Sequence, residues 1–285
     1  MHAEAAPADA ISATAPELLG RAVASQRWSH LVFIHWRVDA ARVAPLLPTG
    51  LRPDVFDGSA WVGLIPFVLD RATVLGSPPV PYFGSFVEVN VRLYAVDEQR
   101  RRGVVFVTLD ASRLAAVLTA RTLFALPYVW ARTTLTRRAP DEFDYSVRRH
   151  LDHGAHTRII ARATSDAVVG DDLADFLTAR WALFTSVRGR TIRLRNHHEP
   201  WPLVRADLLA LDDTLVRRPG RPDAGLGVVL PRCHDAVRGQ RETPADPRAD
   251  RRCWWCEALA VLRSRLRLLL CALLLEGLAR SGLGR

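Results

Sequence analysis

The sequence predicts an α+β protein built mainly from an antiparallel sheet, closed or nearly closed into a β-barrel or cone with a few covering helices. Three observations lead to this fold class. Successive segments alternate apolar and polar residues between turn signals, strand segments outnumber helical ones, and strands and helices do not alternate regularly as a parallel sheet would require. At 285 residues and 49% hydrophobic, the chain can bury a substantial core.

The first half of the chain reads as a leader, two strands and a short helix. Residues 1–26 form an Ala/Pro-rich segment that we expect to be a flexible leader. Residues 28–39 predict a strand, and 40–51 a short helix stopped by proline and glycine. The Asp57-Gly58 pair is a strong hairpin signal and leads into the next strand.

The stretch FVEVNVRLY, residues 86–94, alternates without interruption and predicts a strand with two different rows. One row is aliphatic: Val87, Val89, Val91 and Leu93. The other, here called the polar row, holds Glu88, Asn90, Arg92 and Tyr94 beside Phe86. Glu88 and Arg92 would lie roughly 13 Å apart along the strand, too far to neutralise each other. Each needs a partner on a neighbouring strand or in a bound molecule.

The second half continues as a meander with two further helices. After a charged turn, a strand returns antiparallel, followed by a helix over 111–127 with Asp110 or Ser112 as N-cap. Strands follow at 128–137, 141–151 and 156–165, then a helix over 171–186 with acidic residues at its start. Residues 191–211 read as two strands joined at the rigid EPWP segment.

Composition and charge exclude several classes of function. All 39 basic residues are arginine, so this chain cannot form a Schiff base on a lysine side chain. Residues 217–285 carry 14 Arg against 7 acids, +7, while the other residues carry 25 against 23, only +2. A duplex-binding surface on the main domain is therefore not expected. Without a transmembrane span or a secretory signal, we expect a cytoplasmic protein.

Motifs for metal or nucleophilic chemistry are weak. A Gly-x-Ser-x-Gly elbow and a phosphate-binding glycine loop are absent. The histidines of HLDHGAH lie in a turn-like segment, and the Cys253/Cys256 spacing lacks a second pair. His197 and His198 point opposite ways on an extended segment, so at most one could join a site. We therefore predict no metal and no cofactor.

Several segments together resemble a known family. The residues HW at 35–36, LLPTGL, FDGSAWVGLIPF, FVEVNVRLY, GVVFVTLDAS, LPY, FLTARW and HHEPWPL resemble the YqjF-like family of unknown function. The resemblance covers roughly residues 27–211. It implies a fold of the acetoacetate decarboxylase-like superfamily, an antiparallel barrel or cone enclosing a ligand cavity, here over residues 27–216. The lysine of its decarboxylases has no counterpart in this chain.

In a sheet closed in this way, the aliphatic row suits a helix-covered outer face and the polar row would line the cavity. A structural polar network and a solvated face remain the alternatives. His35 could transfer protons near neutral pH, although a structural role is more common. Arg113 and Arg121, on the helix expected over 111–127, could reach an anion. The ligand-binding candidates are Glu88, Asn90, Arg92, Tyr94, His35, Arg113 and Arg121.

These residues predict a small-molecule-binding protein, with a lysine-independent lyase or hydrolase acting on a small polar metabolite as one form of it. The alternative is a non-catalytic ligand-binding or structural module. Residues 217–285 form a separate basic tail, rich in Arg, Pro and Leu, in which the family's closing strand is not recognisable. Either the tail replaces that strand, or the reading frame shifts near Ala224. A genuine tail would make weak contact with a membrane surface.

Overall fold

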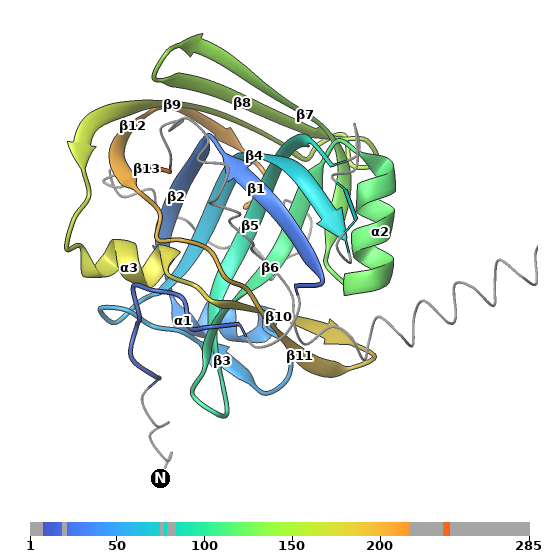
Figure 1. Ribbon diagram of the computed structural model, residues 1–285, viewed down its shortest axis with the longest axis vertical. Coiled ribbons are helices and arrows are strands. Elements are labelled where there is room, and N and C mark those ends of the chain that lie inside the picture. Colours follow the sequence, from blue (N-terminus) through green and yellow to red (C-terminus); the bar gives the residue numbers. More distant parts are fainter. Residues whose placement is uncertain (1–7, 19–21, 75–76, 79–83, 217–235, 240–285) are drawn as a thin grey trace, which may run out of the picture.

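The computed structural model describes residues 8–18, 22–74, 77–78, 84–216 and 236–239, and most of this part of the chain is β-strand (Figure 1). The strands are β1 Ala24–Ser29, β2 Leu31–Val38, β3 Leu51–Pro53, β4 Ala60–Val74, β5 Phe86–Asp97, β6 Arg102–Ala111, β7 Tyr128–Ala139, β8 Glu142–Arg149, β9 His156–Ala167, β10 Ala182–Val187, β11 Arg190–Arg195, β12 Leu203–Asp213 and β13 Ala236–Gly239.

These strands form one sheet in the order β11-β10-β6-β7-β8-β9-β12-β13-β2-β4-β5-β3. In addition, β5 pairs with β6 and β1 with β4. The pairs β10–β6 and β6–β7 are parallel and the remaining pairs are antiparallel. The mainly antiparallel sheet predicted from the sequence is therefore present.

Strand β13 corrects the expectation for the basic tail. It pairs with both β12 and β2, so a strand does follow the PWPL segment, within residues 217–285. The rest of the tail, including its four cysteines and the position of the suspected frame shift, lies outside the described residues.

The helices are short: α1 Ala40–Val43 with a 3-10 turn at Ala44–Leu46, α2 Leu114–Phe124 and α3 Asp172–Thr178. In Figure 1, α2 and α3 lie at opposite sides of the molecule. None of the helices in the described ranges is long and apolar enough to cross a membrane.

Two predictions about helix ends are wrong. The helix expected over 171–186 ends at Thr178, because the residues from Ala182 onward pair with β6 and β11 instead. The N-cap of α2 is Arg113 rather than Asp110 or Ser112. Asp110 forms a buried ion pair with a residue 39 positions away, Arg149.

The Asp57-Gly58 turn is confirmed. Phe56 and Ser59 form a bridge around it, and the two central residues have φ angles of 50° and 71°. Two successive positive φ angles are the geometry that favours an Asp-Gly pair in a tight hairpin turn.

Both rows of β5 are buried, and each belongs to a different core. Val89, Val91 and Leu93 belong to the same core cluster as the β8 aromatics Phe143 and Tyr145. The polar row belongs to the other side, where residues of α2 and α3 pack. Helices α2 and α3 therefore cover the face with the polar row, whereas Val43 of α1 packs in the cluster of the aliphatic row. The expectation that the covering helices lie over the aliphatic row is met by α1 but not by α2 and α3.

The described part of the leader, residues 8–18, contacts the body of the protein. The backbone carbonyl of Asp9 accepts a bond of 2.6 Å from Arg102 Nε, and that of Ser12 accepts one of 2.8 Å from Trp181 Nε1. Glu17 O accepts a further bond from Arg195. A flexible leader does not account for these bonds.

Candidate functional site

A cavity of about 90 Å³ opens beside the polar row, next to the end of α3. Its walls come from β1, β2, β5 and β6, from the last residue of α3 and the segment directly after it, and from the segment between β11 and β12. The lining residues are Gln26, Arg27, Trp28, Phe33, Arg92, Val104, Phe106, Thr178, Arg180, Asn196, His198, Glu199, Pro200 and Trp201.

Arg92 is the one member of the polar row that lines this cavity. Its side chain is 5% exposed, with Nε donating to Tyr94 Oη at 2.9 Å and Nη2 to the Leu177 carbonyl at 2.8 Å. No carboxylate among the described residues forms an ion pair with it. A buried guanidinium normally has an anionic partner, because removing a charge from water is costly.

Tyr94 and His35 support Arg92 from behind the cavity wall. Tyr94 Oη donates to the Leu177 carbonyl at 3.0 Å and lies 2.7 Å from His35 Nε2. Burial, with Arg92 and Arg180 nearby, lowers the pKa of His35 well below its usual value, so the imidazole is neutral at pH 7. A Cβ at residue 63 would lie 2.9 Å from His35 Nε2, so glycine there leaves room for the ring.

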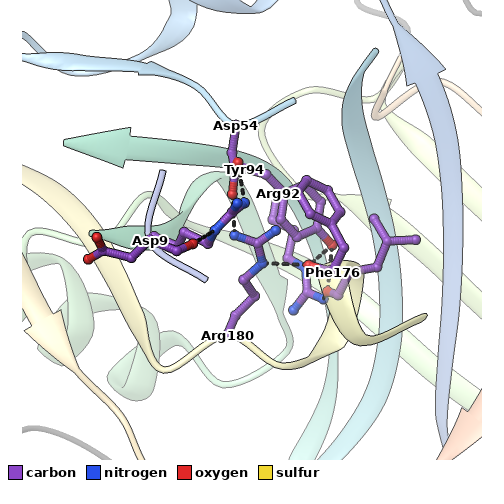
Figure 2. Close-up of polar contacts among 8 residues, drawn as sticks. Asp9, Asp54, Arg92, Tyr94, Phe176 and Arg180 are labelled. Atoms are coloured by element: carbon purple, nitrogen blue, oxygen red, sulfur yellow. Dashed lines mark hydrogen bonds and ion pairs between the residues drawn. The ribbon is translucent and has the colours of Figure 1, made fainter. Parts of the chain in front are cut away.

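Arg180 brings a second buried guanidinium to the cavity, at 4% exposed (Figure 2). Its Nε donates to the Phe176 carbonyl at 2.6 Å and its Nη1 to Asp54 Oδ2 at 2.5 Å. Arg102 Nη1 donates to the other oxygen of Asp54, also at 2.5 Å. One carboxylate thus pairs with two arginines, and Arg92 adds a third guanidinium, which has no carboxylate partner among the described residues.

Aromatic rings form another part of the wall. Trp201 stacks with Trp28 at 6.2 Å between ring centroids, and His198 packs between Trp201 at 4.7 Å and Trp181 at 4.4 Å. Burial, chiefly, lowers the pKa of His198 to about 4, with Arg92 adding to the shift. The histidine is therefore neutral near pH 7 and adds no charge to the cavity.

Glu88 and Asn90 do not line the cavity. Glu88 is 1% exposed and accepts a hydrogen bond of 2.8 Å from Tyr128 Oη. Burial raises its pKa to about 8, so the carboxyl is largely protonated at pH 7. Asn90 is fully buried, and neither its Oδ1 nor its Nδ2 has a hydrogen-bond partner in the described part of the chain.

The candidates on the helix lie apart from the cavity. Arg113 is the N-cap residue of α2, and the exposed Arg121 donates to the Tyr128 carbonyl at 3.3 Å. Neither lines the cavity around Arg92. Of the seven candidates, Arg92 lines it, and Tyr94 and His35 support Arg92 through hydrogen bonds.

Sequence reasoning missed Arg180, Asn196 and Trp201. In the structure all three lie outside regular elements, directly after α3 or between β11 and β12. The position of Arg180 is set by Asp54, 126 residues earlier, and no local signal could reveal that contact. Within the described residues, no three His, Cys, Asp or Glu side chains group together in a way that could hold a metal ion.

Comparison with known proteins identifies similar sequences. Residues 25–234 match the model of the DUF2071 family, described as an uncharacterized conserved protein. The uncharacterized protein YqjF of Bacillus subtilis strain 168 is 35% identical over 187 residues, covering 64% of this chain and 75% of that protein.

Solved structures with a similar fold are acetoacetate decarboxylase-like. An acetoacetate decarboxylase-like enzyme from Sphingomonas wittichii RW1 has a TM-score of 0.51 at 16% identity, covering 77% of this chain and 88% of that one. The enduracididine biosynthesis enzyme MppR complexed with pyruvate has a TM-score of 0.52 at 14% identity, covering 77% and 86%. At such low identity the likeness concerns the fold alone.

Proposed function

The chain belongs to the DUF2071 family, as its resemblance to the YqjF-like family predicts, and we propose that it binds a small carboxylate-bearing metabolite in the cavity around Arg92 and Arg180. One observation carries the proposal. Arg92 is buried at the cavity wall, and its guanidinium has no carboxylate partner among the described residues. A carboxylate on a ligand would supply the missing charge, and arginine's planar fork suits it.

The surroundings of the cavity support a small organic anion. Arg180 and Arg102 share Asp54, so that carboxylate is not available to Arg92. The rings of Phe33, Trp28 and Trp201 provide apolar surface for the body of the ligand. MppR, of similar fold, was solved with pyruvate, a compound of this kind.

We extend the proposal to the shape of the sheet and to the kind of protein. The sheet would close around its core, since β13 joins β12 to β2 while β5 joins β4 to β6. A reaction on the bound acid would be a lyase or hydrolase step without an imine, because this chain has no lysine. Non-catalytic binding of the same ligand is the alternative, and we expect either in the cytoplasm.

The first prediction concerns the two arginines. Arg92→Gln and Arg180→Gln should each weaken binding of pyruvate and acetate by about 10- to 100-fold, because charge-assisted hydrogen bonds contribute roughly 1.5–3 kcal/mol. Isothermal titration calorimetry measures the affinity. Pyruvamide, which has the same shape without the charge, should bind poorly to the unmodified protein.

A matched control comes from the cavity mouth. Arg27 also lines the cavity but is 62% exposed and pairs with Asp70. Arg27→Gln should change the affinity little, since an exposed charge contributes little. Equal affinity for acids and amides, or equal effects of all three substitutions, would rule out a carboxylate site at Arg92 and Arg180. Turnover of a bound acid in the same samples would separate an enzyme from a binding protein.

A further inference from the structure

His198 has a ring nitrogen that is free to contact a molecule in the cavity. Its Nδ1 lies 2.8 Å from the carbonyl oxygen of Glu199, which can only accept, so the neutral ring carries its proton on Nδ1 and a lone pair on Nε2. Nε2 has no hydrogen-bond partner among the described residues, and it is not one of their fully enclosed unpaired atoms. Because His198 lines the cavity, this accessible nitrogen can meet a ligand there.

Arg92 likewise has one nitrogen that is not in use. Its Nε and Nη2 donate to Tyr94 and Leu177, whereas Nη1 has no hydrogen-bond partner in the described part of the chain and is not among the enclosed unpaired atoms there. The cavity that Arg92 and His198 both line measures only about 90 Å³. A ligand in contact with Arg92 therefore lies close to His198.

The charged and titratable groups around His198 decide how its ring responds to a ligand. They are Arg27 on β1, Arg92 on β5, Arg180 after α3, Asp171 and Asp175 at α3, where His198 also lines a second cavity of about 70 Å³, and the chain neighbours His197 and Glu199. Burial is the largest cause of the lowered pKa of His198, and the charges of Arg92 and His197 add to it. A carboxylate bound at Arg92 brings the opposite charge to the same place, so it raises the pKa of His198.

We propose that the cavity binds its carboxylate ligand together with a proton, which His198 takes up on Nε2. This inference rests on the proposed function and gives His198 a role in the site. The proton comes from solvent: an N–H bond forms at Nε2, the ring becomes an imidazolium, and Nε2 changes from an acceptor into a donor. Without the proton, the lone pair of Nε2 and the oxygens of the ligand would oppose each other. With it, Arg92 and His198 both offer donors to the anion.

Titration of the unmodified protein with pyruvate measures the proton directly. In weakly buffered solution at about pH 6, binding should consume up to one proton per site, which a pH electrode records. The affinity for pyruvate should rise by about threefold or more from pH 7.5 to 5.5, because His198 binds its proton more tightly in the complex than in the free protein. Pyruvate itself stays ionised over this range.

Two matched variants assign the proton to His198. His198→Phe should bind pyruvate with the same affinity at pH 5.5 and 7.5, whereas His197→Phe should retain the dependence on pH. His197 is the adjacent residue, but it lines neither cavity, and its Nδ1 lies 3.4 Å from the Pro16 carbonyl. NMR of labelled histidines adds a direct readout, since the signal lost in His198→Phe should titrate at higher pH with saturating pyruvate than without it.

The outcomes separate this inference from the proposed function. Pyruvate binding without proton uptake, and with equal affinity at both pH values, would overturn the role of His198 and leave the carboxylate site intact. A dependence on pH that His198→Phe retains would assign the proton to another group and overturn it as well. His198→Gln replaces His198→Phe if the latter fails to fold. Failure of pyruvate to bind at either pH would overturn both proposals.

Discussion

At the scale of single residues, the polar row of β5 divides into two environments that its regular alternation conceals. Arg92 reaches the cavity, whereas Glu88 is buried away from it with Tyr128 as its hydrogen-bond partner. The sequence predicted correctly that Glu88 and Arg92 do not pair. It could not predict which residue of the row would line the cavity, because that depends on α3 and on the segment after β11.

The buried carboxyl of Glu88 predicts a dependence of stability on pH. Its pKa is raised to about 8 in the folded protein, above the ordinary value of 4.5. Between these pH values the folded state binds more protons than the unfolded state, so the free energy of unfolding should fall as pH rises, by roughly 1.4 kcal/mol per pH unit. Glu88→Gln should remove this contribution.

Urea unfolding of both proteins between pH 6.5 and 8 measures the effect. In this window the contributions of His198 and His35, whose pKa values are lowered and whose effect has the opposite sign, are small and the same in both proteins, so they cancel in the comparison. The unmodified protein should lose stability across the window more steeply than Glu88→Gln. Parallel pH profiles would contradict a protonated Glu88.

At the scale of elements, hydrogen-bonded strands were more predictable than helix ends. Alternation of side chains is a local property, so β5, β6 and the Asp57-Gly58 turn follow from the sequence. The residues after Thr178 form β10 because β6 and β11 offer pairing partners, which helix propensity does not include. Asp110 likewise resembles a cap from its local sequence, while its partner Arg149 lies on β8.

The Asp110–Arg149 ion pair joins β6 to β8, and removing one partner alone should be costly. Its bonds are 2.6 and 2.9 Å long and both side chains are almost fully buried. Arg149→Met should lower the free energy of unfolding by ~3–5 kcal/mol, because a buried carboxylate is left unpaired. Adding Asp110→Val should recover most of the loss.

Urea unfolding measures both variants, and Arg162→Met provides the comparison. Arg162 pairs with Glu142 but is 49% exposed, so its replacement should change stability little. If the double variant were as unstable as Arg149→Met, the loss would come from packing of the arginine rather than from the unpaired charge.

At the scale of the whole molecule, the sequence predicted the mainly antiparallel sheet but not how residues 8–18 and strand β13 attach to the body. Residues 8–18 and strand β13 lie in segments with little periodicity, which local reasoning assigned to a leader and a tail. Both reach the body through contacts with strands and side chains far away in sequence. Such long-range pairing leaves no local signature, because backbone groups of any sequence can make it.

The contacts of the N-terminal segment also extend to the cavity. The Asp9 carbonyl accepts a hydrogen bond from Arg102. Arg102 and Arg180 each donate a hydrogen bond to the carboxylate of Asp54 (Figure 2). The Ser12 carbonyl accepts a hydrogen bond from Trp181 Nε1, and the ring of Trp181 packs on His198. Residues 8–18 therefore contact residues that position two parts of the cavity wall. Removing the segment should lower the affinity of the site.

We predict that removing residues 1–18 lowers both the thermal stability and the affinity for small carboxylates. Arg102 and Trp181 each lose a hydrogen-bond acceptor, at about 1 kcal/mol apiece, and Arg180 and His198 lose part of their support. Removing residues 1–7 alone retains the Asp9 and Ser12 contacts and should leave both quantities unchanged. Thermal unfolding with and without pyruvate compares the three proteins, since a ligand bound to the folded state raises its melting temperature. If the longer deletion matched the unmodified protein in both measurements, the segment would be a leader without a role in the site.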